Sequence, residues 1–257
     1  MISTRKSAIS IAVLFVFGLS AFAATSASAS GATTYTCVKD SGGTLFGSHC
    51  LKDSSGDKYT HVAFSEATTA TATNANTASN TVAAAPFILK YGTFPFNVVE
   101  VRCSEVHGEG TAENKTVEGE MRGHLKTSLH YTGCAVKAPS EKGCKIPGEA
   151  INTNQLAVRS VGGGETVKIE PEEGLEKIAE FTIEGCSIAA FNTTYPVTGS
   201  FEAKTNGATV TTTHNEVTAQ GILMVKNMKA GIESALTFKA HSKAGEETKP
   251  LALTGTA

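Results

Sequence analysis

Residues 117–131 carry the clearest pattern of hydrophobic and polar positions in the chain. Small or apolar side chains occupy every second position, and mostly charged side chains fill the positions between them. A period of two is the period of a β-strand, because successive side chains point to opposite faces of a sheet. The segment therefore predicts a strand with one face in a core and the other in water.

Shorter stretches of the same kind continue along the chain, separated by glycine, proline and asparagine. They predict further strands at 87–91, 96–103, 151–159, 165–170, 178–188, 195–205, 208–213 and 231–240. Asn206-Gly207 lies between two such stretches, and Asn-Gly favours the positive φ angles of a type I′ turn, so we expect a hairpin there. The chain is also rich in Thr, Val, Gly and Ala and has no Trp, a composition that favours an all-β protein.

The chain divides into four parts. Residues 1–29 hold two basic residues, an apolar stretch and then small residues, which predicts a signal peptide cleaved after Ala23 or Ala29. Residues 30–64 form a small β-hairpin unit with strands expected at 35–38, 45–52 and 59–64. Residues 65–85 contain Thr, Ala, Asn and Ser with almost no large apolar side chain, so we interpret them as a linker or an edge strand. Residues 86–257 hold the main β-domain.

A segment at 129–136 is repeated at 181–188. Apolar positions match apolar positions, and the Gly133-Cys134 pair is identical to Gly185-Cys186. The side-chain alternation shifts by one residue at each glycine, as it does at a β-bulge. We interpret the main domain as a pseudo-duplicated β-sandwich or barrel. The alternative is chance similarity, because β-patterning alone supplies the apolar matches.

Six cysteines all follow the predicted signal peptide. An even number of cysteines in an exported chain indicates disulfides, and no CxxC pair favours a cysteine metal site. Sequence alone allows fifteen pairings. Proximity and the repeat favour Cys37–Cys50, Cys134–Cys144 and Cys103–Cys186.

Charge argues against nucleic-acid binding. The formal net charge is −2, and removal of Arg5 and Lys6 with the signal peptide leaves 20 basic against 24 acidic residues, a charge of −4. Binding to a phosphate backbone requires clustered basic charge. After the signal peptide no stretch is apolar enough to span a bilayer, so we expect a secreted protein without a membrane span.

No motif for catalysis is present. Aspartate occurs only at positions 40, 53 and 57, and the chain has no Gly-x-Ser-x-Gly, HExxH or P-loop sequence. Two glutamate pairs, Glu118 with Glu120 and Glu172 with Glu173, could serve as the acid and base of a glycosidase. Alternating glutamates on a strand are more often a solvated surface, and we predict no catalytic residue and no cofactor.

Histidines offer one candidate metal site. A tight turn centred on Ser55 would place His49 opposite His61, close enough for both imidazoles to reach one ion. The alternative is two half-buried histidines in the hairpin. His124 and His130 share a strand face but lie about 20 Å apart, too far to share an ion. His107 is interpreted as part of a Gly-rich turn.

Several short motifs resemble those of exported, uncharacterised β-rich proteins of high-GC Gram-positive bacteria. The matching segments are Phe46-Gly47-Ser48-His49-Cys50-Leu51, Tyr59-Thr60-His61-Val62, Thr132-Gly133-Cys134, Ile151-Asn152-Thr153-Asn154 and Val197-Thr198-Gly199-Ser200. The resemblance implies export and a shared fold, and it carries over no site because no activity is established for that group.

Together these features predict a secreted, disulfide-stabilised, non-enzymatic β-protein with a structural or adhesive role at or beyond the cell surface. The alternative is an extracellular module that binds a ligand, peptide or glycan, which an exposed apolar patch with Tyr or Phe would favour. A secreted hydrolase using Glu and His is a third reading, and it requires carboxyl groups with raised pKa values in a cleft. The partner is unknown and would be at the cell surface or beyond.

Overall fold

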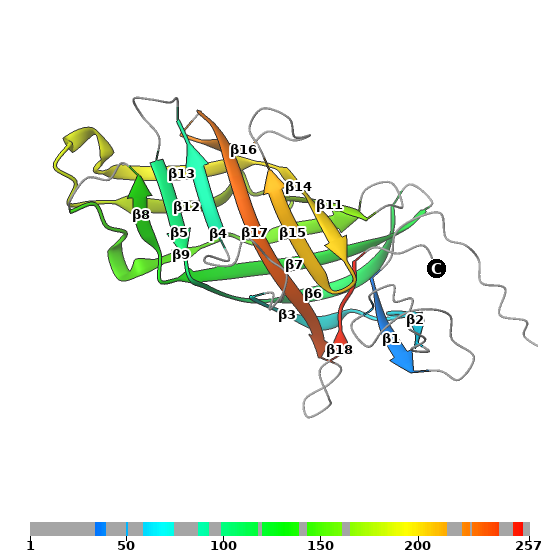
Figure 1. Ribbon diagram of the computed structural model, residues 1–257. Coiled ribbons are helices and arrows are strands. Elements are labelled where there is room, and N and C mark those ends of the chain that lie inside the picture. Colours follow the sequence, from blue (N-terminus) through cyan, green and yellow to red (C-terminus); the bar gives the residue numbers. More distant parts are fainter. Residues whose placement is uncertain are drawn as a thin grey trace, which may run out of the picture.

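A computed structural model describes residues 34–39, 50, 59–74, 87–92, 99–117, 120–138, 143–160, 165–214, 223–226, 228–241 and 249–253. The predicted signal peptide, and most of the predicted strand at 45–52, lie outside these residues. The described residues form antiparallel strands and two short 3-10 helices, Pro147–Glu149 and Ala189–Phe191 (Figure 1). The all-β prediction is confirmed. In these ranges no helix has the length and hydropathy needed to cross a membrane.

Eight strands form a closed ring, which corresponds to the barrel alternative of the predicted fold. Each strand pairs antiparallel with the next, and the last pairs with the first. In ring order they are β3 (Thr68–Asn74), β6 (Glu105–Val117), β7 (Glu120–Thr132), β10 (Leu156–Ser160), β11 (Thr166–Pro171), β14 (Phe201–Asn206), β15 (Thr209–His214) and β17 (Met228–His241). Ring order is also chain order, so neighbouring strands in the ring follow one another along the sequence.

Every second connection of the ring carries additional strands. These are β4 (Phe87–Tyr91) and β5 (Val99–Cys103), β8 (Ala135–Ala138) and β9 (Ala150–Asn152), β12 (Lys177–Ile183) and β13 (Thr193–Gly199), and β16 (Leu223–Val225). Alternate connections of an antiparallel ring leave from the same end, so all these strands extend one end of the ring (Figure 1). There β4 and β16 continue the ladder along the first half of β17.

Two glycines on β6 allow close contact with neighbouring strands. A Cβ atom on Gly110 would lie 1.9 Å from the Lys126 carbonyl oxygen, and one on Gly108 would lie 2.6 Å from Leu129 Cδ2. Glycine is therefore required here by close packing inside a strand. The interpretation of His107 as part of a Gly-rich turn is wrong, because the Gly-rich sequence belongs to β6.

The Thr/Ala alternation at 68–74 also forms a strand rather than a linker. Strand β3 pairs with β6 on one side and β17 on the other, so it is not an edge strand. Its inward residues Ala70 and Ala72 are each 1 % exposed. Because these side chains and the β6 glycines are small, two inner faces that lack large apolar groups can still close the ring.

The interior holds a single cluster of apolar side chains that runs through the ring and the added strands. The alternation predicted for 117–131 is observed in β7, where Leu125, Leu129 and Tyr131 are buried and His130 is exposed. His124 differs, because it lies on the outer face and is nevertheless only 7 % exposed.

The N-terminal unit is a hairpin of β1 (Tyr35–Lys39) and β2 (Tyr59–Ala63). It contacts the ring end opposite the added strands, near the tip of β6, and Tyr35 forms a bridge to Ala252 beyond β18 (Lys249–Pro250). Asn114 of β6 holds it in place. The Asn114 side-chain oxygen accepts hydrogen bonds from Thr34 N and Oγ1 at 2.7 and 2.8 Å, and its amide donates to the carbonyl oxygens of Thr34 and Phe64.

The disulfides are Cys37–Cys50, Cys103–Cys134 and Cys144–Cys186. The first was predicted correctly, and the predicted Cys134–Cys144 and Cys103–Cys186 pairs are wrong. The β6–β7 hairpin explains the second bridge, because it places Glu105 opposite Thr132 and thus brings the residues just beyond them together. Proximity along the chain does not predict the Cys103–Cys134 bridge, because this bridge depends on the pairing of β6 with β7.

The β-bulges predicted at the two Gly-Cys segments are not observed. Each glycine instead directly follows the end of a strand. Strand β7 ends at Thr132 and β12 at Ile183, and the following Gly133 and Gly185 have φ angles of +61° and +74°. The register shifts of this sheet lie elsewhere, within the β12–β13 and β5–β8 pairs. A left-handed glycine thus turns the chain at each site. Internal duplication remains a prediction.

The two glycine-cysteine pairs that meet in space are Gly143-Cys144 and Gly185-Cys186. A Cβ atom on either glycine would lie 2.5–2.7 Å from the other's carbonyl oxygen. Beside the disulfide, Lys145 and Glu184 exchange two backbone hydrogen bonds of 2.9 and 3.0 Å. The backbones therefore cross closely at this point.

The Asn206-Gly207 hairpin is confirmed, and its turn lies one residue further on. Asn206 pairs with Thr209, so the loop consists of Gly207 and Ala208. Of these two residues only Gly207 has a positive φ, +57°, whereas a type I′ turn needs two. The turn type was therefore wrong.

Candidate functional site

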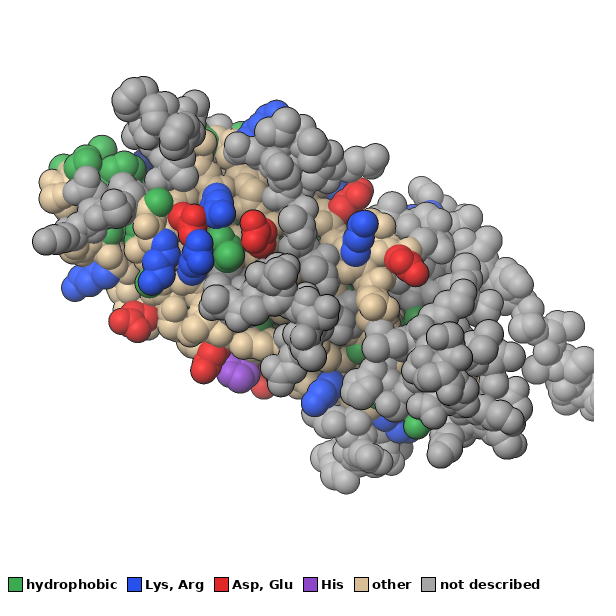
Figure 2. Space-filling model, in the orientation of Figure 1, with side chains coloured by type: hydrophobic (Ala, Val, Ile, Leu, Met, Phe, Trp, Pro, Cys, Tyr) green, Lys and Arg blue, Asp and Glu red, His purple; other side chains and the backbone are tan. Residues whose placement is uncertain are grey.

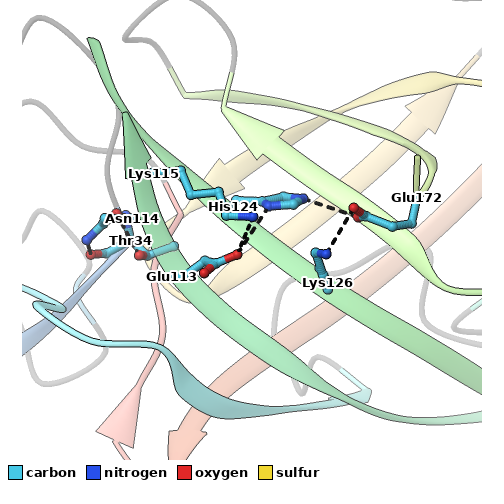
Figure 3. A network of polar contacts seen from close by, with 7 residues as sticks. All are labelled: Thr34, Glu113, Asn114, Lys115, His124, Lys126 and Glu172. Atoms are coloured by element: carbon cyan, nitrogen blue, oxygen red, sulfur yellow. Dashed lines mark hydrogen bonds and ion pairs between the residues drawn. The ribbon is translucent and has the colours of Figure 1, made fainter. Parts of the chain in front are cut away.

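A cluster of charged side chains surrounds His124 on the outer face of the ring (Figure 3). His124 of β7 lies opposite Glu113 of β6, and Glu172 follows the end of β11. His124 Nε2 is 3.3 Å from Glu172 Oε2, and its Nδ1 is 3.7 Å from Glu113 Oε1. The imidazole therefore lies between two carboxylates.

Two lysines neutralise these carboxylates. Lys126 Nζ is 3.2 Å from Glu172 Oε1, and Lys115 Nζ is 2.8 Å from Glu113 Oε1. Burial raises the pKa of Glu172, but the hydrogen bond from Lys126 and the neighbouring positive charges outweigh it, so the pKa lies below its usual value. The hydrogen bond from Lys115 lowers the pKa of Glu113.

This arrangement is unsuited to acid–base catalysis. Both ring nitrogens of His124 face carboxylates, which leaves neither directed at a substrate. Burial lowers the pKa of His124, and both glutamates keep their charge more readily than free glutamate does. A hydrolase of the predicted kind needs a carboxyl group with a raised pKa. The cluster is a set of paired charges on the ring surface.

The glutamates considered for glycosidase chemistry do not converge in the described part of the chain. Glu172 is 8 % exposed and bound to Lys126, whereas Glu173 is exposed in the adjoining turn. Glu118, and the side chain of Glu120, lie outside the described residues.

His61 lies in the N-terminal hairpin, opposite Cys37. Its ring centroid is 3.9 Å from that of Tyr35, and burial lowers its pKa to about 4. His49 lies outside the described residues, so the proposed His49–His61 pair stays a prediction. Among the residues that are described, no group of three or more His, Cys, Asp and Glu side chains is arranged to hold a metal ion.

We expect His61 to make the protein sensitive to mild acid. Its lowered pKa means that the unfolded chain takes up a proton below pH 6.5 while the folded chain does not until about pH 4, so stability falls as the pH drops through that window. With solvent screening at this partly buried ring, the loss is about 1–2 kcal/mol. His61→Phe keeps an aromatic ring against Tyr35 and should flatten this part of the curve of unfolding free energy against pH, measured with urea. An unchanged slope would contradict the assignment.

An interior cavity of about 40 Å³ lies between the ring and the added strands. Its lining is almost entirely apolar and includes Leu129, Phe181 and Phe238. Apolar cavities of about 150 Å³ are needed to hold benzene. This cavity is much smaller, so the interior is a nearly filled core and not a preformed ligand site.

Sequence reasoning missed four polar contacts. The side chains of Asn114 and Asn192 both form hydrogen bonds within the fold, Asn192 to the backbone of Cys186. The Glu113–His124 pair could have been found from the β6–β7 register. The Glu172 contact could not, because it depends on the pairing of β7 with β10 and of β10 with β11.

Comparisons with protein-family models, with curated proteins and with solved structures find no match for this chain.

Proposed function

We propose that the protein is exported and acts as a non-enzymatic, disulfide-stabilised β-scaffold with a structural or adhesive role at or beyond the cell surface. The observation that carries this proposal is that all six cysteines are paired in disulfides. Disulfides of this kind persist in oxidising compartments. The predicted signal peptide and the resemblance to exported β-rich proteins of high-GC Gram-positive bacteria support the same conclusion.

The surface and interior favour this role over a ligand-binding module. Large exposed apolar side chains among the described residues are aliphatic or Met: Val38, Val62, Met121, Leu175 and Ile188. Val38 and Val62 share a face of the β1–β2 hairpin, and the other three lie on separate elements. No exposed Phe or Tyr patch of the kind that marks a binding groove is present in the described part. On the face shown in Figure 2, the basic and acidic side chains are interspersed.

The proposal is tested by producing the chain from residue 1 in a bacterium and separating cells from medium. We expect the protein outside the cytoplasm, starting at residue 24 or 30 by mass spectrometry, with no thiol that reacts before reduction. Labelled protein should sediment with cells or cell-wall fragments. Reduced protein retained in the cytoplasm would overturn export. Turnover of glycoside, ester or peptide substrates that depends on His124 or Glu172 would overturn the non-enzymatic role.

A further inference from the structure

A row of polar side chains crosses four strands on the outer face of the ring. Thr73 of β3 pairs with His107 of β6, His107 with His130 of β7, and His130 with Asn152 of β9. His107, His130 and Asn152 are all exposed. The row follows from the β6–β7 register, which places the two histidines directly opposite each other.

We propose that His107 and His130 together bind one divalent transition-metal ion of the Zn²⁺, Ni²⁺ and Cu²⁺ class. Directly opposed residues of an antiparallel pair have Cβ atoms about 4.5–5.5 Å apart. Two imidazoles at that spacing can both reach one ion at metal–nitrogen distances of about 2.0–2.1 Å. Imidazole is a preferred ligand of these metals.

Asn152 prepares His130 for this role. The side-chain oxygen of Asn152 lies within hydrogen-bond reach of His130 Nδ1. An amide oxygen only accepts hydrogen bonds, so the proton stays on Nδ1 and the lone pair is on Nε2. Histidine ligands commonly donate their second nitrogen to a partner in this way, which fixes both the tautomer and the orientation of the ring. Asn152 is therefore a positioning residue.

The charges around the pair favour a cation. Glu105 and Glu109 lie two residues before and after His107, on the same exposed face of β6. The facing positions on β7, Ser128 and Thr132, carry no positive charge. Since no three acidic or histidine groups in the described chain form a closed metal cage, the two imidazoles are the protein ligands and water completes the coordination. The site is thus open and exchangeable.

His124 and His61 lack these properties. Both ring nitrogens of His124 face carboxylates and the side chain is buried, and the ring of His61 packs at a tilt against that of Tyr35. His124→Gln and His61→Gln are therefore matched controls for the two ligand variants.

The test is titration of the purified, untagged protein with Zn²⁺ by calorimetry and with Cu²⁺ by electron paramagnetic resonance. We expect one ion per chain with two nitrogen ligands. His107→Gln and His130→Gln should each weaken binding at least tenfold, while His124→Gln and His61→Gln leave it unchanged. Each variant is first compared with the parent by circular dichroism without metal; His107 and His130 are exposed, so their replacement should not alter folding.

Variants of Asn152 test whether this residue acts by positioning the ring of His130, or whether the loss of any polar group near the site weakens metal binding. Asn152→Ala should weaken Zn²⁺ binding about tenfold, as removal of such a partner does at other metal sites, and Asn152→Asp should restore it. Absence of Zn²⁺ and Cu²⁺ binding would overturn the proposal. So would binding that survives both ligand variants, and binding lost in His61→Gln alone would place the ion at the N-terminal hairpin instead.

Discussion

Replacing Cys144 and Cys186 together with alanine should lower the free energy of unfolding by about 4 kcal/mol, as the chain-entropy model gives for a loop of this length. The bridge joins residues 42 positions apart and links the β8–β9 connection to the β12–β13 connection. Without it the unfolded chain gains freedom, while the folded chain keeps the Lys145–Glu184 bridge at this crossing. Urea titration measures the effect as a lower midpoint with a similar slope.

The Cys37–Cys50 pair provides the matched control. It closes a separation of 13 residues, so the same model gives a smaller loss, about 3 kcal/mol for the double alanine variant. The loss should also be local, because this bridge lies within the N-terminal unit and its small separate cluster. A Cys144/Cys186 double variant that unfolds at the parent's urea midpoint would show that the backbone contacts alone hold the crossing.

The second large effect is expected at Asn114. Asn114→Ala removes four hydrogen bonds that join β6 to Thr34 and Phe64, and Thr34 is 0 % exposed. Buried donors and acceptors that lose their partners cost more than the bonds contribute, so we expect a loss of about 3 kcal/mol. The N-terminal hairpin should detach first, which proteolysis and hydrogen exchange can detect.

Asn154→Ala is the control for this variant. Asn154 is exposed and its side chain donates one hydrogen bond, to the Lys177 carbonyl oxygen, so its loss should cost about 1 kcal/mol or less. Asn114→Asp keeps the acceptor for Thr34 and loses the two donated bonds, and should give an intermediate stability. Equal stability of Asn114→Ala and Asn154→Ala would contradict a role for Asn114 in holding the hairpin.

Much of the fold was predictable because half-buried strands impose a period of two on the sequence. The alternation of polar and apolar residues predicted strand β7, and a short apolar stretch predicted strand β4 with the bounds that are observed. Strand β6 was missed because Gly108 and Gly110 remove the apolar signal from its inner face. Those glycines are required by neighbours that only the folded ring brings close.

Two further omissions follow from the missed strand. Once β6 is paired with β7, Cys103 and Cys134 lie just beyond the pair Glu105–Thr132, and His107 lies opposite His130. The contact of His124 with Glu172 is of another kind. It joins residues from β7 and the end of β11, and their proximity depends on the pairing of β10 with both strands rather than on any local pattern.

Closure of the ring also bears on how the protein behaves when it is concentrated. An unpaired strand edge is a template for addition of a strand from another molecule, and each of the eight ring strands has a neighbour on both sides. Outside the ring, the described ladders leave one side of β2, β8 and β12 without a paired strand, and β12, the longest of these at seven residues, has a single bridge from Ala179 to Thr153 on that side. Ring closure thus withdraws the longest described strands of the molecule, β6, β7 and β17, from pairing with another chain.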